Sequence, residues 1–295
     1  MSGNNQNAAG VKLCINKRIR TSDVMILIVI LLVGLLFLYP FVYILSASLT
    51  DGYTYFTKGI ILFPKDVTLE NFIEVFRIRY FAQAAVISFT KTIFGTAISV
   101  LLISMLAFGL CDKKLKGRSF FVKFLFITTI FNGGMIPYVA VLQSLNLMNS
   151  YWVYILPAVY SFFNMIIIRT NFDGIPESIA EAAKLDGAGD MRIFFEIYLP
   201  LAKPALVVVA MYTAVFHWND WFAGEYYVTN EKMKPLSTLL QDLVMRSGAG
   251  SAEDAIANSA KTMAFTVFMI LPIALVYPFL QKYFMDGVTI GSIKE

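Results

Sequence analysis

The chain has 295 residues, of which 58% are hydrophobic and 15% are charged, with a mean hydropathy of +0.67. Soluble domains carry about 25% charged residues, so this composition excludes an ordinary soluble protein and predicts a membrane protein. The net charge of +4 is modest and gives no indication of nucleic-acid binding.

The first predicted membrane span follows a polar N-terminal tail, residues 1–23, which holds four basic residues between Lys12 and Arg20. The apolar run Val24–Leu49 is about 26 residues long, which is too long for a signal-peptide core and long enough to cross a bilayer. We therefore predict an uncleaved span that Pro40 kinks. Together with its outer loop, this span occupies residues 24–82.

Residues 50–82 form a mixed segment with one predicted helix. Thr68 is placed to cap this helix, and four apolar or aromatic residues share one face: Phe72, Val75, Phe76 and Tyr80. Such a face suits a helix lying at the membrane interface or a helix packed on the bundle, and the sequence leaves both interpretations open.

The second predicted span, Ala84–Cys111, contains one charged residue, Lys91. A lysine at mid-bilayer costs roughly 2.5–3.5 kcal/mol on insertion scales. A lysine nearer the end of a span can extend its amine to the interface. We favour this snorkelling position, and attraction of an acidic substrate is the alternative.

Four further spans are predicted from apolar runs. The third, residues 120–143, contains the run Asn132–Pro137 (Asn-Gly-Gly-Met-Ile-Pro), whose glycines and proline allow close helix approach and a bend. The remaining three spans are residues 151–169, 201–225 and 262–283, the last of them bent by Pro272 and Pro278.

A polar segment, residues 171–199, separates the fourth and fifth spans. Pro176 suits the first turn of a helix, where its missing N–H costs nothing. Ala180, Ala183 and Gly187 then fall at i, i+3 and i+7, which leaves one helix face almost without side chains. A bare helix face allows another surface to pack closely against it.

The ends of this polar segment's helices are also predicted. Gly187 and Gly189 can end the first helix, because glycine tolerates the left-handed geometry of a C-terminal cap. Asp190 can cap a second short helix, and Pro200 breaks it before the next apolar run. The segment is therefore predicted to be a helix-turn-helix on the membrane face.

Positive charge indicates how six spans are oriented. If the N-terminus is cytoplasmic, the cytoplasmic segments hold 15 Lys and Arg residues, and the outer segments hold 8. The positive-inside rule then places both termini and the polar segment in the cytoplasm.

The polar segment also resembles a known family. Its order is Glu-Ala-Ala, three residues, Gly, nine residues, Ile, one residue and Leu-Pro, filled here by Glu181, Ala182, Ala183, Gly187, Ile197, Leu199 and Pro200. This pattern resembles the cytoplasmic loop of binding-protein-dependent ABC importer permeases. In that family the loop forms coupling helices that dock into a cleft of the ATPase subunit. The resemblance implies that Glu177, Ala180 and Asp186 join the same coupling surface. An ordinary surface hairpin is the alternative.

The resemblance implies an all-α, polytopic membrane protein with six transmembrane helices, the type I ABC importer transmembrane domain. Residues 83–284 would form its core of five helices, with the coupling loop 171–199 and the outer loop 226–260, and residues 285–295 would be a cytoplasmic tail. Span 1 resembles the addition found in maltose-type carbohydrate permeases. The outer loop occupies the place where the family's second permease subunit can reach into the binding protein.

Polar and aromatic residues within the spans are candidates for a substrate path: Trp218, Asn219, Asp220, Trp221, Asn132 and Asn164. Indoles offer flat faces to sugar C–H groups, and polar groups within a bilayer usually face a cavity or a partner. The span-5 cluster resembles the Trp-Asn pattern of sugar importer permeases. An aromatic belt with helix packing is the alternative for the tryptophans, and hydrogen bonding between helices is the alternative for the asparagines.

Catalytic and metal motifs are absent from the sequence. It has no Gly-x-x-x-x-Gly-Lys-Ser/Thr, no His-Glu-x-x-His and no Gly-x-Ser-x-Gly. Cys14 and Cys111 are interpreted as free thiols, and the single histidine, His217, as a packing residue. We therefore expect no enzyme activity, no metal and no cofactor bound by this chain. The resemblance places ATP and Mg on partner ATPase subunits.

The function implied is a permease subunit of an ATP-driven importer for oligosaccharides in the cell (plasma or inner) membrane. The run Asn132–Pro137 resembles a subgroup that handles complex or uronic-acid-containing oligosaccharides. The implied partners are a second homologous permease, two ATPase subunits, an extracellular or periplasmic substrate-binding protein, the oligosaccharide and membrane lipid, without nucleic acid. The alternatives are a non-sugar ABC importer permease and an ion-coupled secondary transporter, which would need an internal repeat and intramembrane carboxylates.

Overall fold

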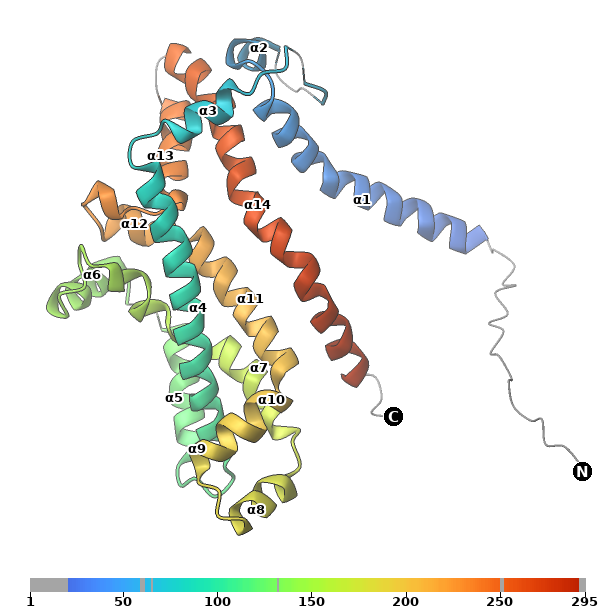
Figure 1. Ribbon diagram of the computed structural model, residues 1–295, viewed down its shortest axis with the longest axis vertical. Coiled ribbons are helices and arrows are strands. Elements are labelled where there is room, and N and C mark those ends of the chain that lie inside the picture. Colours follow the sequence, from blue (N-terminus) through green and yellow to red (C-terminus); the bar gives the residue numbers. More distant parts are fainter. Residues whose placement is uncertain (1–20, 59–61, 65, 132, 250–251, 292–295) are drawn as a thin grey trace, which may run out of the picture.

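The structure is a computed structural model that describes residues 21–58, 62–64, 66–131, 133–249 and 252–291. These residues form helices and turns, with one isolated antiparallel bridge between Thr50 and Val67. The predicted all-α fold is therefore confirmed. Long helices run along the molecule, with α8 at one end and α3 and α13 toward the other (Figure 1). We call these the α8 end and the α13 end.

The helices of the first half are α1 (Thr21–Ser48), α2 (Gly52–Lys58), α3 (Glu70–Phe76), α4 (Phe81–Cys111), α5 (Arg118–Ile130), α6 (Met135–Ser144), the 3₁₀ turns η1 (Tyr151–Tyr154) and η2 (Leu156–Ala158), and α7 (Phe162–Asp173). Those of the second half are α8 (Glu177–Leu185), α9 (Asp190–Ile193), the π-helical turn η3 (Phe194–Tyr198), α10 (Leu199–Leu201), α11 (Lys203–Asn219), α12 (Phe222–Tyr226), the 3₁₀ turn η4 (Glu231–Met233), α13 (Leu236–Ala249) and α14 (Ala252–Gly291).

Three helices are each long and apolar enough to cross a membrane: α1, α4 and residues 258–279 of α14. Three pairs reach this length with a bend between their parts, namely α5 with α6 (116°), residues 151–158 with α7 (51°) and residues 190–201 with 203–226 (83°). When each bent pair is taken as one span, the described residues hold the six predicted spans.

The predicted third span is two helices rather than one bent helix. α5 ends at Ile130 and α6 starts at Met135. Pro137 lies in the first turn of α6, where its missing N–H interrupts no helical hydrogen bond. α6 projects sideways from the bundle, near α12 (Figure 1).

The helix predicted after Thr68 is shorter than expected. Leu69, not Thr68, is the N-cap residue, although the Thr68 hydroxyl accepts a hydrogen bond from the Glu70 N–H at 3.1 Å. α3 ends at Phe76. Tyr80 has a left-handed φ of 63° and precedes α4, so it does not share the α3 face. Val75 is buried against α4 and α14, which favours packing on the bundle over an isolated interfacial helix.

The bundle is built around α4, which packs against α7 and α11, and α14, which packs against α11 and α13. α14 continues as one helix through Pro272 and Pro278 and reaches Gly291, so the tail predicted for residues 285–295 begins inside a helix. α1 joins the bundle at its C-terminal end, where Ser46–Ser48 are buried, and diverges from α14 over the rest of its length (Figure 1).

Candidate functional site

The polar segment 171–199 folds at the α8 end as the predicted helix-turn-helix. Pro176, predicted for the first turn of the helix, instead occupies the N-cap position, and α8 begins at Glu177. Proline is well suited to the start of a helix because its missing N–H removes a donor that would have no partner there.

A glycine ends α8, as the sequence predicts. Gly187 has a φ of +83°, its N–H donates to the Lys184 carbonyl at 3.0 Å, and the Ala188 N–H donates to the Ala183 carbonyl at 2.9 Å. This pair of hydrogen bonds is a Schellman motif, in which glycine avoids the strain that a Cβ creates in the left-handed region.

The second helix differs from the prediction at three points. Gly189, with φ −73°, does not end α8 but occupies the N-cap position of α9. Asp190 is therefore the first residue of α9, and its carboxylate pairs with Lys184 at 3.1 Å instead of capping. The chain turns at Ala202, two residues beyond Pro200, where α10 ends and α11 starts. Pro204 lies in the first turn of α11 and has no N–H with which to continue the preceding helix.

α8 presents two different faces. Ala180 and Ala183 are half-buried and pack on the protein's own core, so the bare face predicted from the alanine spacing is turned inward. On the opposite side, Ile179 is 41% exposed and Leu185 is 89% exposed. We call Ile179, Ala182 and Leu185 the α8 outer face.

Sequence analysis did not single out Ile179 and Leu185. Their spacing with Ala182, three residues apart each time, is the signal that could have identified them. Exposed apolar side chains at the tip of a charged helix-turn-helix indicate a surface that another protein covers.

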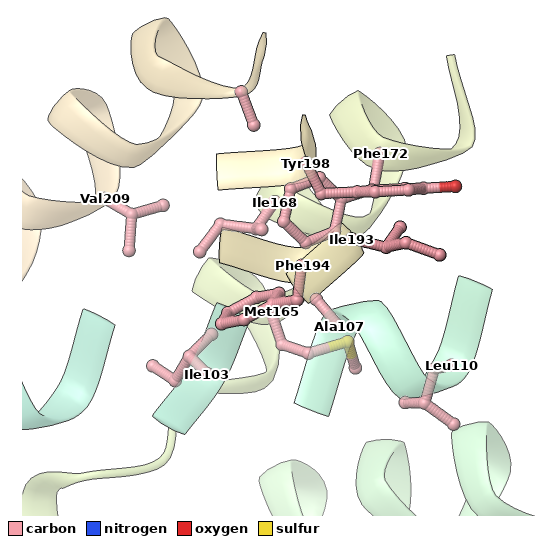
Figure 2. Close-up of a cluster of buried hydrophobic side chains, with 11 residues drawn as sticks. Ile103, Ala107, Leu110, Met165, Ile168, Phe172, Ile193, Phe194, Tyr198 and Val209 are labelled. Carbon is pink, nitrogen blue, oxygen red and sulfur yellow. The ribbon is translucent and has the colours of Figure 1, made fainter. Parts of the chain in front are cut away.

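A cluster of buried side chains joins α9 and η3 of this helix-turn-helix to α4, α7 and α11 (Figure 2). Phe194 of η3 packs tilted against Phe108 of α4, and Tyr198 of η3 packs edge-on against it, with ring centroids 5.3 and 4.9 Å apart. Tyr198 also meets Phe172 of α7 edge-on at 5.3 Å. The predicted residues Ile197 and Leu199 pack on the same cluster, whereas Pro200 is exposed. Because such interiors are close-packed, this cluster connects the loop firmly to α4, α7 and α11.

An ion pair ties the start of α8 to the loop between α4 and α5. Lys113 Nζ lies 2.9 Å from Glu177 Oε1. The hydrogen bond from Lys113 lowers the pKa of Glu177 below its usual value and raises the pKa of Lys113. Both side chains are well exposed, so water screens the pair, and it orients α8 more than it stabilises the fold.

Toward the α13 end, Lys91 of α4 forms a buried charge pair with Asp220. The Lys91 side chain has no exposed surface. Its ammonium donates to the Asp220 main-chain carbonyl at 2.6 Å, lies 4.0 Å from Asp220 Oδ2 and faces the Tyr154 ring at 5.1 Å. Lys91 therefore neither snorkels to the interface nor faces a substrate, because Asp220 provides an internal partner. The two residues are 129 positions apart, so no local pattern predicts their contact.

Asp220 occupies the break between α11 and α12. Its carbonyl also accepts a hydrogen bond from the Ser237 hydroxyl at 2.7 Å, and its Oδ1 accepts one from the Ala223 N–H at 3.2 Å. A helix break leaves backbone groups without helical partners, and within a membrane these groups must be satisfied internally. Asp220 and Lys91 supply those partners and link α4, α11, α12 and α13.

The other predicted path residues have different surroundings. Trp218 is buried, donates from its indole N–H to the Met269 carbonyl at 3.0 Å and meets Phe89 edge-on at 5.1 Å. Asn164 is buried and donates to the Thr213 hydroxyl at 3.3 Å. Trp218 and Asn164 thus hold helices together, which is the alternative that the sequence left open. Asn219 is exposed, Trp221 is half-buried, and Asn132 lies outside the described residues.

Among the predicted path residues that the structure describes, Asp220 lines a cavity beside α6. Trp218, Asn219, Trp221 and Asn164 do not line this cavity. His217 is fully buried against Gly95, as a packing role requires, but neither ring nitrogen has a hydrogen-bond partner among the described residues. Within the described ranges, no group of three or more His, Cys, Asp or Glu side chains could hold a metal ion. The expectations of no metal and no cofactor remain predictions.

Comparison with known proteins gives a consistent picture. Residues 20–290 match the family described as binding-protein-dependent transport system inner membrane component. The chain is 35% identical over 283 residues to the polygalacturonan/rhamnogalacturonan transport system permease protein YtcP of Bacillus subtilis (strain 168), covering 93% of this chain and 99% of that protein. It is 29% identical to the arabinooligosaccharides transport system permease protein AraQ of Halalkalibacterium halodurans, covering 87% and 91% of the two chains.

A solved structure resembles the whole fold. One chain of a bacterial ABC transporter involved in the import of the acidic polysaccharide alginate superposes with a TM-score of 0.81 and 30% sequence identity. The match covers 91% of this chain and 99% of that chain.

Proposed function

The chain belongs to the family of binding-protein-dependent transport system inner membrane components, and from this premise we propose that it is the permease subunit of an ATP-driven importer for oligosaccharides. Relatives named for polygalacturonan and arabinooligosaccharides, and the alginate transporter, support a substrate of this class. The acidic sugars in two of these names favour an acidic or plant-polysaccharide-derived oligosaccharide.

The observation that carries the proposed mechanism is the way α8 and η3 pack on the rest of the protein. The α8 outer face exposes Leu185, while η3 beneath it packs into a cluster shared by α4, α7 and α11. We propose that an ATPase subunit covers this outer face. Movement of α8 then tilts the spans through the buried cluster, as alternating access requires.

The coupling residues predicted from the sequence take distinct parts in this proposal. Glu181, Ala182 and Asp186 are exposed and contact the ATPase, whereas Ala180, Ala183, Ile197 and Leu199 connect the loop to the spans. Glu177 sets the direction of α8 through Lys113. Gly187 forms the turn that ends α8. Pro200 is exposed and lies in α10.

The proposed assembly contains a second homologous permease, two ATPase subunits that hold ATP and Mg, and an extracellular or periplasmic substrate-binding protein. This chain forms half of the translocation path and hydrolyses no ATP. It lies in the cell membrane with both termini in the cytoplasm, as the distribution of Lys and Arg residues favours.

The test is Leu185→Asp and Ala182→Asp in the complete complex reconstituted in liposomes. A carboxylate buried in the ATPase cleft without a partner lowers ATP-dependent oligosaccharide uptake about tenfold or more, while the chain still inserts. Ser119→Asp is the matched control, because it adds the same charge at an exposed position of α5, at the same end of the molecule but outside the coupling loop. Ala183→Asp is a poorer test, since Ala183 is half-buried on the protein's own core.

Normal uptake by both α8 variants at normal expression would contradict the coupling role. Uptake by this chain alone, driven by an ion gradient, would instead identify a secondary transporter. Copurification of an ATPase with the wild-type chain, and its loss in Leu185→Asp, is the expected result.

A further inference from the structure

A cavity of about 800 Å³ lies between the α5–α6 connection, the η1–η2 segment and the α11–α12 break. This volume is within the range of small-molecule sites in proteins. Four of its lining residues are aromatic and well exposed: Phe131 (76%), Tyr138 (42%), Phe216 (57%) and Phe222 (39%). The cavity wall therefore offers aromatic surface that no side chain of the described protein covers.

Charge in this cavity comes from one residue. Asp220 is the only acidic side chain among the described lining residues, and these include no Lys or Arg. The Asp220 side chain is 16% exposed and accepts a hydrogen bond from the Ala223 N–H through Oδ1. A carboxylate has further acceptor positions, and these can receive hydroxyl protons.

Lys91 stands behind this carboxylate and away from the cavity. It is not a lining residue, and its side chain is completely buried. Its ammonium balances the charge of Asp220 and fixes the carboxylate at the cavity wall, but it is unavailable to a ligand. A negatively charged sugar carboxylate therefore finds no cation among the described lining residues.

We infer that this cavity is a saccharide subsite that recognises ring faces and hydroxyl groups. Tyr138, Phe216 and Phe222 provide flat apolar surfaces for the C–H groups of pyranose rings, and Asp220 accepts sugar hydroxyls. Lys91 is a positioning residue for Asp220. This inference rests on the proposed oligosaccharide transport. It assigns to this chain the recognition of the ring faces and hydroxyl groups of the sugar.

The functional test uses the complete complex, including its ATPase, second permease and binding protein, in liposomes with trigalacturonate as the probe. Tyr138→Ala and Phe216→Ala should each lower the maximal uptake rate about three- to tenfold, since aromatic contacts of this kind are worth about 0.5–1.5 kcal/mol. Tyr138→Phe keeps the ring and should stay within about twofold. Phe94→Ala is the matched control, because Phe94 is a similarly exposed aromatic residue of α4 (55%) outside the cavity.

A second measurement identifies what occupies the cavity. A photoreactive p-benzoylphenylalanine in place of Tyr138 should crosslink to labelled trigalacturonate during turnover. Crosslinking to the second permease alone would mean that the partner's side chains fill the cavity, and this would overturn the inference.

The uptake data separate this inference from the proposed function. Equal uptake by wild type, Tyr138→Ala and Phe216→Ala would overturn the subsite but leave the importer function intact. Absence of ATP-dependent uptake in the wild-type complex, with its cognate binding protein present, would overturn both. The amount of assembled complex and its basal ATP hydrolysis, measured in every variant, exclude misfolding as the cause of a loss.

Discussion

The two ends of the bundle hold their irregular backbone by opposite means. At the α8 end, the helix-turn-helix is fixed by an apolar cluster, and its charged groups remain at the surface, as in the Lys113–Glu177 pair. Toward the α13 end, the break after α11 is fixed by a buried ammonium and a carboxylate, Lys91 and Asp220.

This difference follows from the solvent around each break. A turn at the membrane surface can leave its polar groups to water, so apolar packing suffices to hold it. A break within a predicted span has less access to water, so most of its freed backbone groups need a partner in the protein. Variants at the two ends should therefore respond differently to loss of charge, loss of volume and change of pH.

The largest effect is expected from Lys91→Met. This variant removes the ammonium and leaves the Asp220 carboxylate largely buried without its charge partner, which should cost about 3–5 kcal/mol of unfolding free energy. Denaturant titration of the purified protein in detergent measures the loss. The double variant with Asp220→Asn removes both charges and should recover part of it. If both variants are as stable as the wild type, the charge pair does not hold this break.

Removal of volume at the α8 end provides the counterpart. Phe194→Ala opens a cavity in the cluster beneath α8 and should lower the unfolding free energy by about 3–5 kcal/mol. The same variant should hydrolyse ATP in the complex with reduced uptake, because the link from α8 to the spans is loosened.

Phe195→Ala is the control for Phe194→Ala. Phe195 is the next residue and is 51% exposed, so its truncation should change stability by only about 0.5 kcal/mol. A similar loss in both variants would show that the buried cluster has no special part in holding the α8 end.

A smaller effect is expected where α4 and α11 approach closely. A Cβ on Gly95 would lie 2.5 Å from His217 Nε2. Gly95→Ala should therefore cost about 1–3 kcal/mol through overpacking, although alanine is the better helix former. A double-mutant cycle measured by denaturant titration tests this contact. The double variant, with Gly95→Ala and His217→Ala, should lose less unfolding free energy than the sum of the losses in the two single variants. Strict additivity would contradict the close packing of these two residues.

The smallest effect concerns pH at the α8 end. Because Lys113 lowers the pKa of Glu177 in the folded protein, the pair favours folded α8 above the ordinary glutamate pKa of about 4.3. This contribution is lost as the pH falls through the lowered folded value. Lys113→Ala should therefore speed amide exchange in the first turn of α8 at neutral pH relative to wild type, and the two proteins should converge in acid.

High salt should shrink this difference in amide exchange, since both side chains are well exposed. Lys116→Ala is the control, because it removes an exposed lysine of the same loop outside the ion pair. A difference that persists in acid would exclude the ion pair as its cause.

Local patterns in the sequence determined much of the α8 end. Pro176 and Gly187 act through their own backbone geometry, so the start and end of α8 were predictable from neighbouring residues. The lengths of the apolar runs likewise predicted the spans, because bilayer thickness sets how many residues a helix needs. The Glu-Ala-Ala pattern pointed to the family that the comparisons then established.

Only the tertiary structure decided which faces and partners these elements use. The alanine spacing identified a bare face of α8, but packing on α4 and α7 turned that face inward and left Leu185 outside. Trp218 and Asp220 are two positions apart. Trp218 donates a hydrogen bond to α14, whereas Asp220 lines the cavity. The contact of Lys91 with Asp220 depends on how α4 and α11 dock, and helix periodicity within either segment contains no information about that docking.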